Sequence, residues 1–261
     1  MLIILGYILL GALAGLIAGI FGLGGGIIIV PTLIFTFSYL DFPEEVLTHL
    51  AVGTSLSTIL FTSLSAIYVH HQKSAINWPL ALKLSIGMLI GGLLGAYVAE
   101  FFSGELLQIL FASYSLTVAL QMWFSWQPKG HFLLPKRVGL GLLGGAIGIV
   151  SGLFGIAGGS LVVPILTLYR VKITQAIATS AVTGFPIAIS GSIGYLLMGW
   201  NNEALPEHSV GYIYLPATLG IIISSTVFAK FGAKLTHSLP APQLKKAFSI
   251  LLLLVAIKLF L

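Results

Sequence analysis

Two glycine-rich stretches are the strongest candidates in this sequence for a binding site. They read "GIFGLGGGIIIVPTL" over residues 19–33 and "GLFGIAGGSLVVPIL" over residues 152–166, and eight of the fifteen positions are identical. Glycine allows a tight turn and removes the side chain, so a ligand can approach the backbone N–H groups. A helix that begins just after such a turn directs its N-terminal amides and positive dipole end at the turn, which favours an anion. We therefore expect the two stretches to form an anion site.

The glycines also allow two other interpretations. In membrane helices they often serve only close helix packing, through small residues four positions apart, and that interpretation stays open. A nucleotide-binding fingerprint is the other one. It is disfavoured because no strand precedes the glycines and no acidic residue follows them at the required distance.

Two pairs of hydroxyl residues recur at matching places downstream of the glycines. "AVGTSL" (51–56) aligns with "AIATSA" (176–181), so that Thr54 and Ser55 match Thr179 and Ser180. At about 1.5 Å per helical residue, both pairs lie roughly 10–15 Å into an apolar segment. Hydroxyls at that depth can donate to an anion without a charge of their own, or they can bond the carbonyls of their own helix.

His49 is the histidine nearest to these pairs. It precedes Thr54 by about one helical turn and could take up a proton during transport. The simpler alternative is that it lies in a polar vestibule.

Other kinds of chemistry find little support in the sequence. The chain has no cysteine, and its seven acidic residues all lie between apolar segments, so a carboxylate relay for protons or sodium is not expected. No metal-ligand cluster and no nucleophile–base pair lies within the apolar segments, which disfavours an intramembrane enzyme. We expect no cofactor and no metal. The net charge of +5 indicates cytoplasmic loops rather than nucleic-acid binding.

The composition indicates that these residues lie in or between membrane helices. The chain has 261 residues, of which 57% are hydrophobic and only 7% charged. A soluble domain carries about 25% charged residues, so this chain is expected to lie in a lipid bilayer as an all-α polytopic protein. The apolar segments are residues 2–37, 46–69, 78–99, 106–126, 138–168, 174–199, 211–229 and 244–261.

The charges between the segments predict their direction. The first, third and sixth joints contain all the acidic residues, and the second, fourth, fifth and seventh contain most of the basic ones, so the latter are expected to be cytoplasmic. Segment 138–168 then begins beside Arg137 and ends beside Arg170 on the same side. Its roughly 31 residues are too few for two crossings and a turn. The segment is expected to be a re-entrant hairpin, the alternative being one long kinked helix.

The repeat divides the chain into residues 1–126, a cytoplasmic linker at 127–137, and residues 138–261. Each copy is a re-entrant or broken-helix hairpin followed by three transmembrane helices. Since every matching joint changes sides between the copies, we expect inverted repeats with both termini outside. Such repeats are typical of secondary transporters, whose binding site lies near the midplane.

The doubled motif, with the "GTSL" and "ATSA" pairs, resembles the sulfite exporter TauE/SafE family of bacterial inner-membrane permeases over essentially the whole chain. The resemblance implies transport of a small sulfur-containing oxyanion such as sulfite, a sulfonate or sulfoacetate. An anion channel on the same scaffold is the alternative. One departure is Ala157, where the first copy has Gly24. The residues expected to bind substrate are Gly24, Gly25, Gly26, Thr54, Ser55, Gly158, Gly159, Ser160, Thr179 and Ser180.

Overall fold

The structure is a computed structural model that describes residues 2–22, 24–124, 134–235 and 241–260. These parts of the chain form ten α-helices and no strand. Seven of the helices are long and apolar enough to cross a membrane. The prediction of an all-α polytopic membrane protein is therefore confirmed. Most of the predicted linker at 127–137 lies outside the described residues.

The two halves of the chain have the same order of helices. The first half forms α1 (Leu2–Phe21), α2 (Gly26–Tyr39), α3 (Glu44–Gln72), α4 (Trp78–Ala99) and α5 (Gly104–Trp123). The second half forms α6 (Arg137–Phe154), α7 (Gly159–Leu168), α8 (Ile173–Met198), α9 (Leu215–Leu235) and α10 (Ala241–Phe260). Each half thus consists of a long helix, a short helix and three further long helices.

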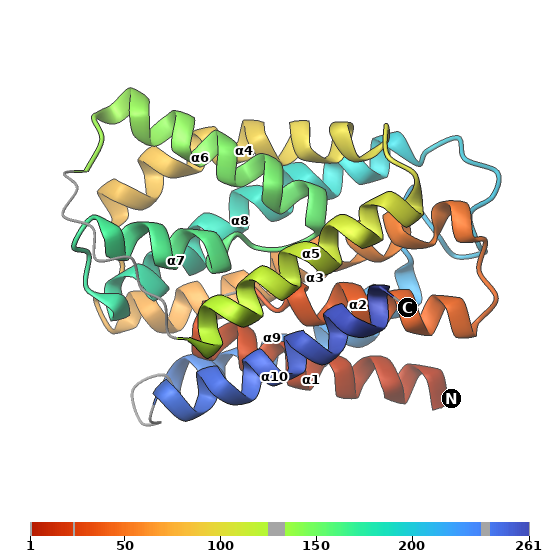
Figure 1. The fold of residues 1–261 in the computed structure, drawn as a ribbon, viewed down its shortest axis with the longest axis horizontal. Helices are drawn as coiled ribbons and strands as arrows, with labels where there is room; N and C mark the ends of the chain where they lie inside the picture. The colour runs from red at the N-terminus through yellow and green to blue at the C-terminus, as the bar shows by residue number, and fades with distance from the viewer. Residues whose placement is uncertain (1, 23, 125–133, 236–240, 261) are drawn as a thin grey trace.

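Both glycine-rich stretches interrupt a helix, as the sequence predicts. Figure 1 shows α1 running inward from the end of the bundle where the chain starts, and α2 running back to that same end. The pair α6 and α7 does the same from the opposite end. With ten residues, α7 rises only about 15 Å, half the thickness of a bilayer's apolar core. The figure also shows that α1 begins and α10 ends at the same end of the bundle.

Glycines bring two pairs of long helices into backbone contact. Along α1, a Cβ added at Gly11, Gly15 or Gly19 would lie 2.3–2.4 Å from a carbonyl oxygen of α9. Along α6, a Cβ added at any of three equally spaced glycines would lie 2.3–2.7 Å from a carbonyl oxygen of α4. These three are Gly144, Gly148 and Gly152. The packing interpretation is therefore correct for these six glycines of α1 and α6, whereas those at the breaks need a separate explanation.

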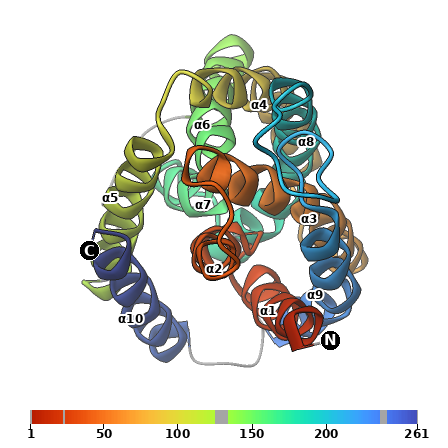
Figure 2. The ribbon, with the colours of Figure 1, turned by 90° about the vertical axis from the view of Figure 1, so that its right-hand side faces the viewer.

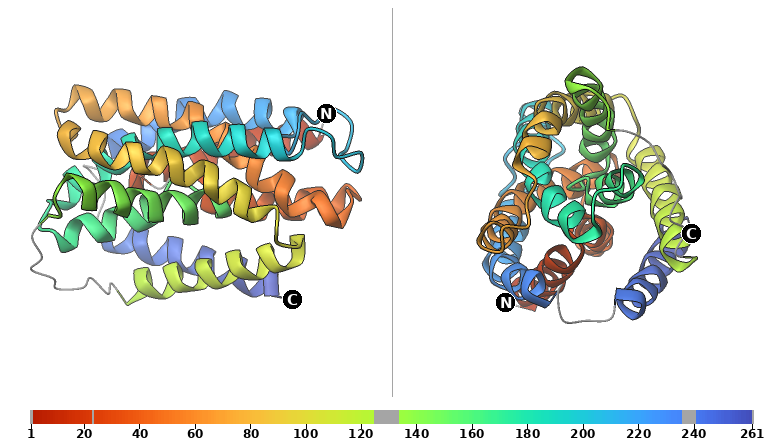
Figure 3. Two further views of the ribbon diagram at one scale, coloured as in Figure 1. Left: turned by 90° about the horizontal axis from the view of Figure 1, so that it is seen from above. Right: turned by 90° about the vertical axis from the view of Figure 1, so that its left-hand side faces the viewer.

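The short helices lie in the interior of the bundle. Viewed along the bundle, α2 and α7 lie between the paired helices α5 and α10 on one side and the other long helices, and the ring of long helices is open between α1 and α10 (Figure 2). The view from the opposite end gives the same arrangement (Figure 3). α3 packs against α8 and α9, and α8 also packs against α4. The two breaks are thus enclosed by helices from both halves.

Candidate functional site

Each break is a turn that only glycine adopts readily. Gly25 precedes α2 with φ 77°, and Gly158 precedes α7 with φ 71°. A positive φ costs an L-residue with a side chain free energy, whereas glycine adopts it freely. We call residues 22–26 the first tip, of which Leu23 is not described, and residues 155–159 the second tip.

The two tips lie against each other inside the bundle. A Cβ added at Gly24 would lie 2.0 Å from Cβ of Ala157. A Cβ added at Gly26 would lie 2.2 Å from the carbonyl oxygen of Gly155. The described tip residues, including the predicted site residues Gly24, Gly25, Gly26, Gly158 and Gly159, are all buried. Glycine at position 24 therefore allows backbones from the two halves of the chain to touch.

The second tip presents backbone amides at the start of α7. The N–H groups of Leu161 and Val162 donate to the carbonyl of Gly158 at 2.9 and 2.8 Å. The N–H groups of Gly159 and Ser160 find no acceptor among the described residues. Unpaired amides at the first turn of a helix, together with its dipole, favour an anion.

Two hydroxyl side chains stand close to the second tip. Ser160, a predicted site residue, has its Oγ hydrogen-bonded to the hydroxyl of Tyr114 on α5. The hydroxyl of Ser151 on α6 is fully buried and has no partner within the described residues. Its Oγ lies 3.1 Å from the position that a Cβ on Gly158 would occupy. Sequence reasoning missed Tyr114 and Ser151, because neither belongs to a repeated motif.

The predicted serines bind the opposite tips. The hydroxyl of Ser55 on α3 donates to the carbonyl of Gly155 at 2.8 Å. The hydroxyl of Ser180 on α8 lies 3.2 Å from the carbonyl oxygen of Gly22, and 2.8 Å from that of Ile177 in its own helix. Both serines are completely buried. Each serine therefore joins its own half of the chain to the tip of the other half.

The predicted threonines accept hydrogen bonds from the opposite half. The backbone N–H of Tyr214, just before α9, donates to Oγ1 of Thr54 at 2.9 Å. The backbone N–H of Asn77, the N-cap of α4, donates to Oγ1 of Thr179 at 3.2 Å. In this conformation all four hydroxyls of the Thr-Ser pairs bind backbone groups. Their predicted contact with an anion stays a prediction.

His49 lies away from the tips. Its Nε2 is 3.0 Å from the carbonyl oxygen of Ala99, and its ring lies against that of Tyr212 at 5.3 Å. Because a carbonyl can only accept, Nε2 carries the proton. Nδ1 is buried and has no partner in the described part of the chain. His49 therefore has one nitrogen that could take up a proton, and its coupling role stays a prediction.

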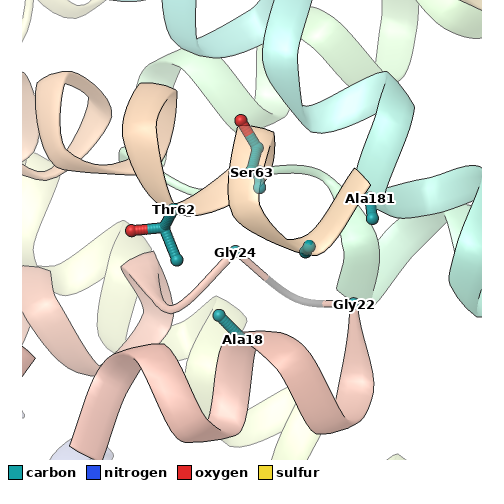
Figure 4. A pocket seen from close by; sticks show the side chains of 8 residues that line it. Ala18, Gly22, Gly24, Thr62, Ser63 and Ala181 are labelled. Carbon is teal, nitrogen blue, oxygen red and sulfur yellow. The ribbon is translucent and has the colours of Figure 1, made fainter. Parts of the chain in front are cut away.

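A small cavity adjoins the meeting point of the tips (Figure 4). The volume open to the centre of a water molecule in this cavity is about 10 Å³, which is enough for roughly one water. Oγ1 of Thr62, which the sequence did not indicate, lies 3.0 Å from Oγ of Ser225 on α9. This cavity, as described, is too small for an oxyanion. The cavity is lined by Ala18, Gly22, Gly24, Thr62, Ser63, Ala66, Ala157 and Ala181.

The described residues offer little for other chemistry. Among them, no group of three or more histidine, aspartate or glutamate side chains could hold a metal ion. The acidic side chains lie in the first turn of a helix or between helices. The interior of the bundle thus contains hydroxyls and backbone dipoles rather than carboxylates.

Comparisons with known proteins agree on one family. The model of the family described as "Sulfite exporter TauE/SafE" matches residues 7–259. A "Probable membrane transporter protein" of Haemophilus influenzae is 39% identical, over 97% of each chain. A "Probable membrane transporter protein" of Methanocaldococcus jannaschii is 29% identical, over 91% of this chain and 88% of its own.

A more distant relative also matches over nearly the whole length. The "Probable membrane transporter protein YunE" of Bacillus subtilis is 27% identical, over 97% of this chain and 95% of its own. No solved structure matches the chain. The family match, which covers the helices of both halves and both tips, agrees with the resemblance carried by the doubled motif. The chain belongs to the sulfite exporter TauE/SafE family.

Proposed function

We propose that the protein is a secondary transporter for a small sulfur-containing oxyanion such as sulfite, a sulfonate or sulfoacetate. The observation that carries the proposal is the meeting of two glycine tips in the interior, each followed by the N-terminus of a helix. Partial positive charge from two helix N-termini is thereby concentrated at one buried place that contains no carboxylate. An anion of one or two charges matches that environment, whereas a cation would lack a counter-charge.

The proposed mechanism is alternating access between two inverted repeats. Reciprocal contacts support the repeats: α1 packs on α9 as α6 packs on α4, and each serine bonds the other half's tip. Helix pairs that enter from opposite ends and meet in the middle are typical of such transporters. Because the tips touch and the adjoining cavity holds one water, substrate would enter only after the halves rock apart on one side.

We also propose that the protein lies in a bacterial inner membrane with both termini outside. The positive-inside rule assigns the joints that contain Arg137 and Arg170 to the cytoplasm. The start of α1 and the end of α10, which lie together at the other end of the bundle, would then face outward.

Flux measurements in proteoliposomes test the function. Purified protein is expected to take up labelled sulfite, thiosulfate, sulfoacetate or taurine with saturation, and faster when the same anion is loaded inside. A channel would give flux without saturation or counter-transport. The G24A variant, whose new Cβ would collide with Ala157, should lose most of the flux. G6A is the matched control, since a Cβ added at Gly6 meets nothing within 4 Å. No saturable uptake of any of the four anions would overturn the proposal.

A further inference from the structure

Each tip joins two helix ends of opposite polarity. α1 ends and α2 begins at the first tip, and α6 ends and α7 begins at the second. A helix C-terminus exposes carbonyl oxygens and a partial negative charge, whereas an N-terminus exposes amides and a partial positive charge. A tip therefore favours an anion only if its carbonyl end is neutralised while its amide end stays free.

At each tip a serine hydroxyl lies within hydrogen-bond distance of one carbonyl oxygen of the carbonyl end, and the Ser180 hydroxyl shares its proton with the carbonyl of Ile177 in its own helix. The carbonyl of Gly155, the C-cap of α6, accepts the hydroxyl of Ser55 at 2.8 Å. The carbonyl of Gly22, which follows α1, lies 3.2 Å from the hydroxyl of Ser180. The turn also uses the carbonyl of Ser151, which accepts the N–H of Ile156 at 3.0 Å. By contrast, the N–H groups of Gly159 and Ser160 stay free of partners among the described residues.

The two serines are shielded from bulk solvent. Both side chains are completely buried, and the tip glycines are buried as well. Removal of either hydroxyl would leave a buried carbonyl oxygen without that donor. Buried carbonyl oxygens bind cations, and rings of them form the selectivity filters of cation channels. The sign of the charge that the tips attract therefore depends on these hydroxyls.

We propose that Ser55 and Ser180 determine the ion selectivity of the tips by occupying their carbonyls, so that only amides face the substrate. The serines act as positioning residues for the tip backbone, in place of the direct anion contact that the sequence suggests. The inference rests on the proposed function, because it explains why a transporter with these tips would select anions.

The test compares S55A and S180A with a matched serine in proteoliposomes. S190A is the control, since that buried hydroxyl bonds only carbonyls of its own helix, α8, and does not reach a tip. S55A and S180A are expected to lower anion flux about tenfold, because each leaves a buried carbonyl oxygen at a tip without its hydroxyl donor. Both variants should also admit labelled sodium under an inside-negative potential, whereas wild type and S190A should remain impermeable to sodium. S55C and S180C, whose thiol is a weaker donor, should give an intermediate sodium leak.

The sodium leak separates this inference from the proposed function. Melting temperatures that match wild type show that each variant is folded. If wild type carries no sulfur anion but S55A and S180A leak sodium, the proposed substrate is wrong and the role of the serines holds. If wild type carries the anion and both alanine variants stay tight to sodium with unchanged anion flux, the serines do not set selectivity. A leak in S190A equal to theirs would also overturn the inference.

Discussion

Both tips have a glycine with positive φ directly before the short helix. They differ one residue earlier, where Gly24 has φ 72° and Ala157 has no positive φ, and in the side chains around them. Beside the second tip, the δ1 methyl of Ile187 would lie 3.0 Å from a Cβ on Gly158, and Leu56 fills the space beside Gly191. With Thr54 aligned on Thr179, Ile187 matches Thr62, and Leu56 matches Ala181. Thr62 and Ala181 line the cavity beside the first tip. Smaller or more polar side chains thus border the cavity beside the first tip, where the matching positions beside the second tip carry larger aliphatic side chains.

This difference shows which features a doubled site keeps and which it changes. Both tips keep the positive φ before the short helix and the serine bonded to a tip carbonyl. These features shape the backbone, and both helix starts need them. The surrounding side chains determine where free volume lies, and a cavity beside one tip does not require a second cavity beside the other. We therefore expect changes to the shared backbone to act alike in both halves, and changes to the side chains to act differently.

The largest effect is expected from side chains at the shared turn. G25V and G158V would each force a β-branched residue to a positive φ, with strain of about 1–3 kcal/mol. Overpacking of the buried tip adds about 1–3 kcal/mol. Thermal melting in detergent should show a similar large loss for both variants, with G141A, where a Cβ meets nothing within 4 Å, as control. A large loss of stability in only one of the two variants would show that the turn before the short helix does not restrict the backbone equally in both halves.

A smaller loss of stability is expected when the second side is opened. L56A removes a fully buried side chain that packs against Gly191. Such truncations cost about 2–5 kcal/mol. The melting temperature should fall, whereas A181G, on the side with existing space, should lower it less. A loss in L56A no larger than that in A181G would contradict the expectation.

The smallest change in stability is expected when the first side is filled. A181V places two more methyl groups beside the cavity, where space for about one water exists. Overpacking costs about 1–3 kcal/mol, and the existing space should keep the loss of stability near the lower end of that range. Anion flux should fall, because the space beside the tips is lost. Flux in proteoliposomes and melting in detergent measure the two effects separately. Wild-type flux in A181V would show that the cavity plays no part in transport.

Residue types and their periodicity determined the membrane helices of this protein and the places where two of them break. Long apolar segments imply membrane helices because lipid cannot satisfy a free backbone, and the breaks follow from glycines that adopt a positive φ. The repeated glycine and Thr-Ser motifs also identified residues that the fold gathers at the tips or bonds across the two halves. These features are readable because each depends on neighbours close in the chain.

The partners of those residues were decided only by the tertiary structure. Ser55 is 100 residues away from Gly155, and no local pattern indicates that its hydroxyl binds that carbonyl. Tyr114 contacts Ser160 only because α5 packs near the start of α7. The cavity depends on side chains of α1, α3 and α8 and on both tips together. Hydrogen-bond partners and free volume are set by which helices pack together, and that choice depends on the whole bundle at once.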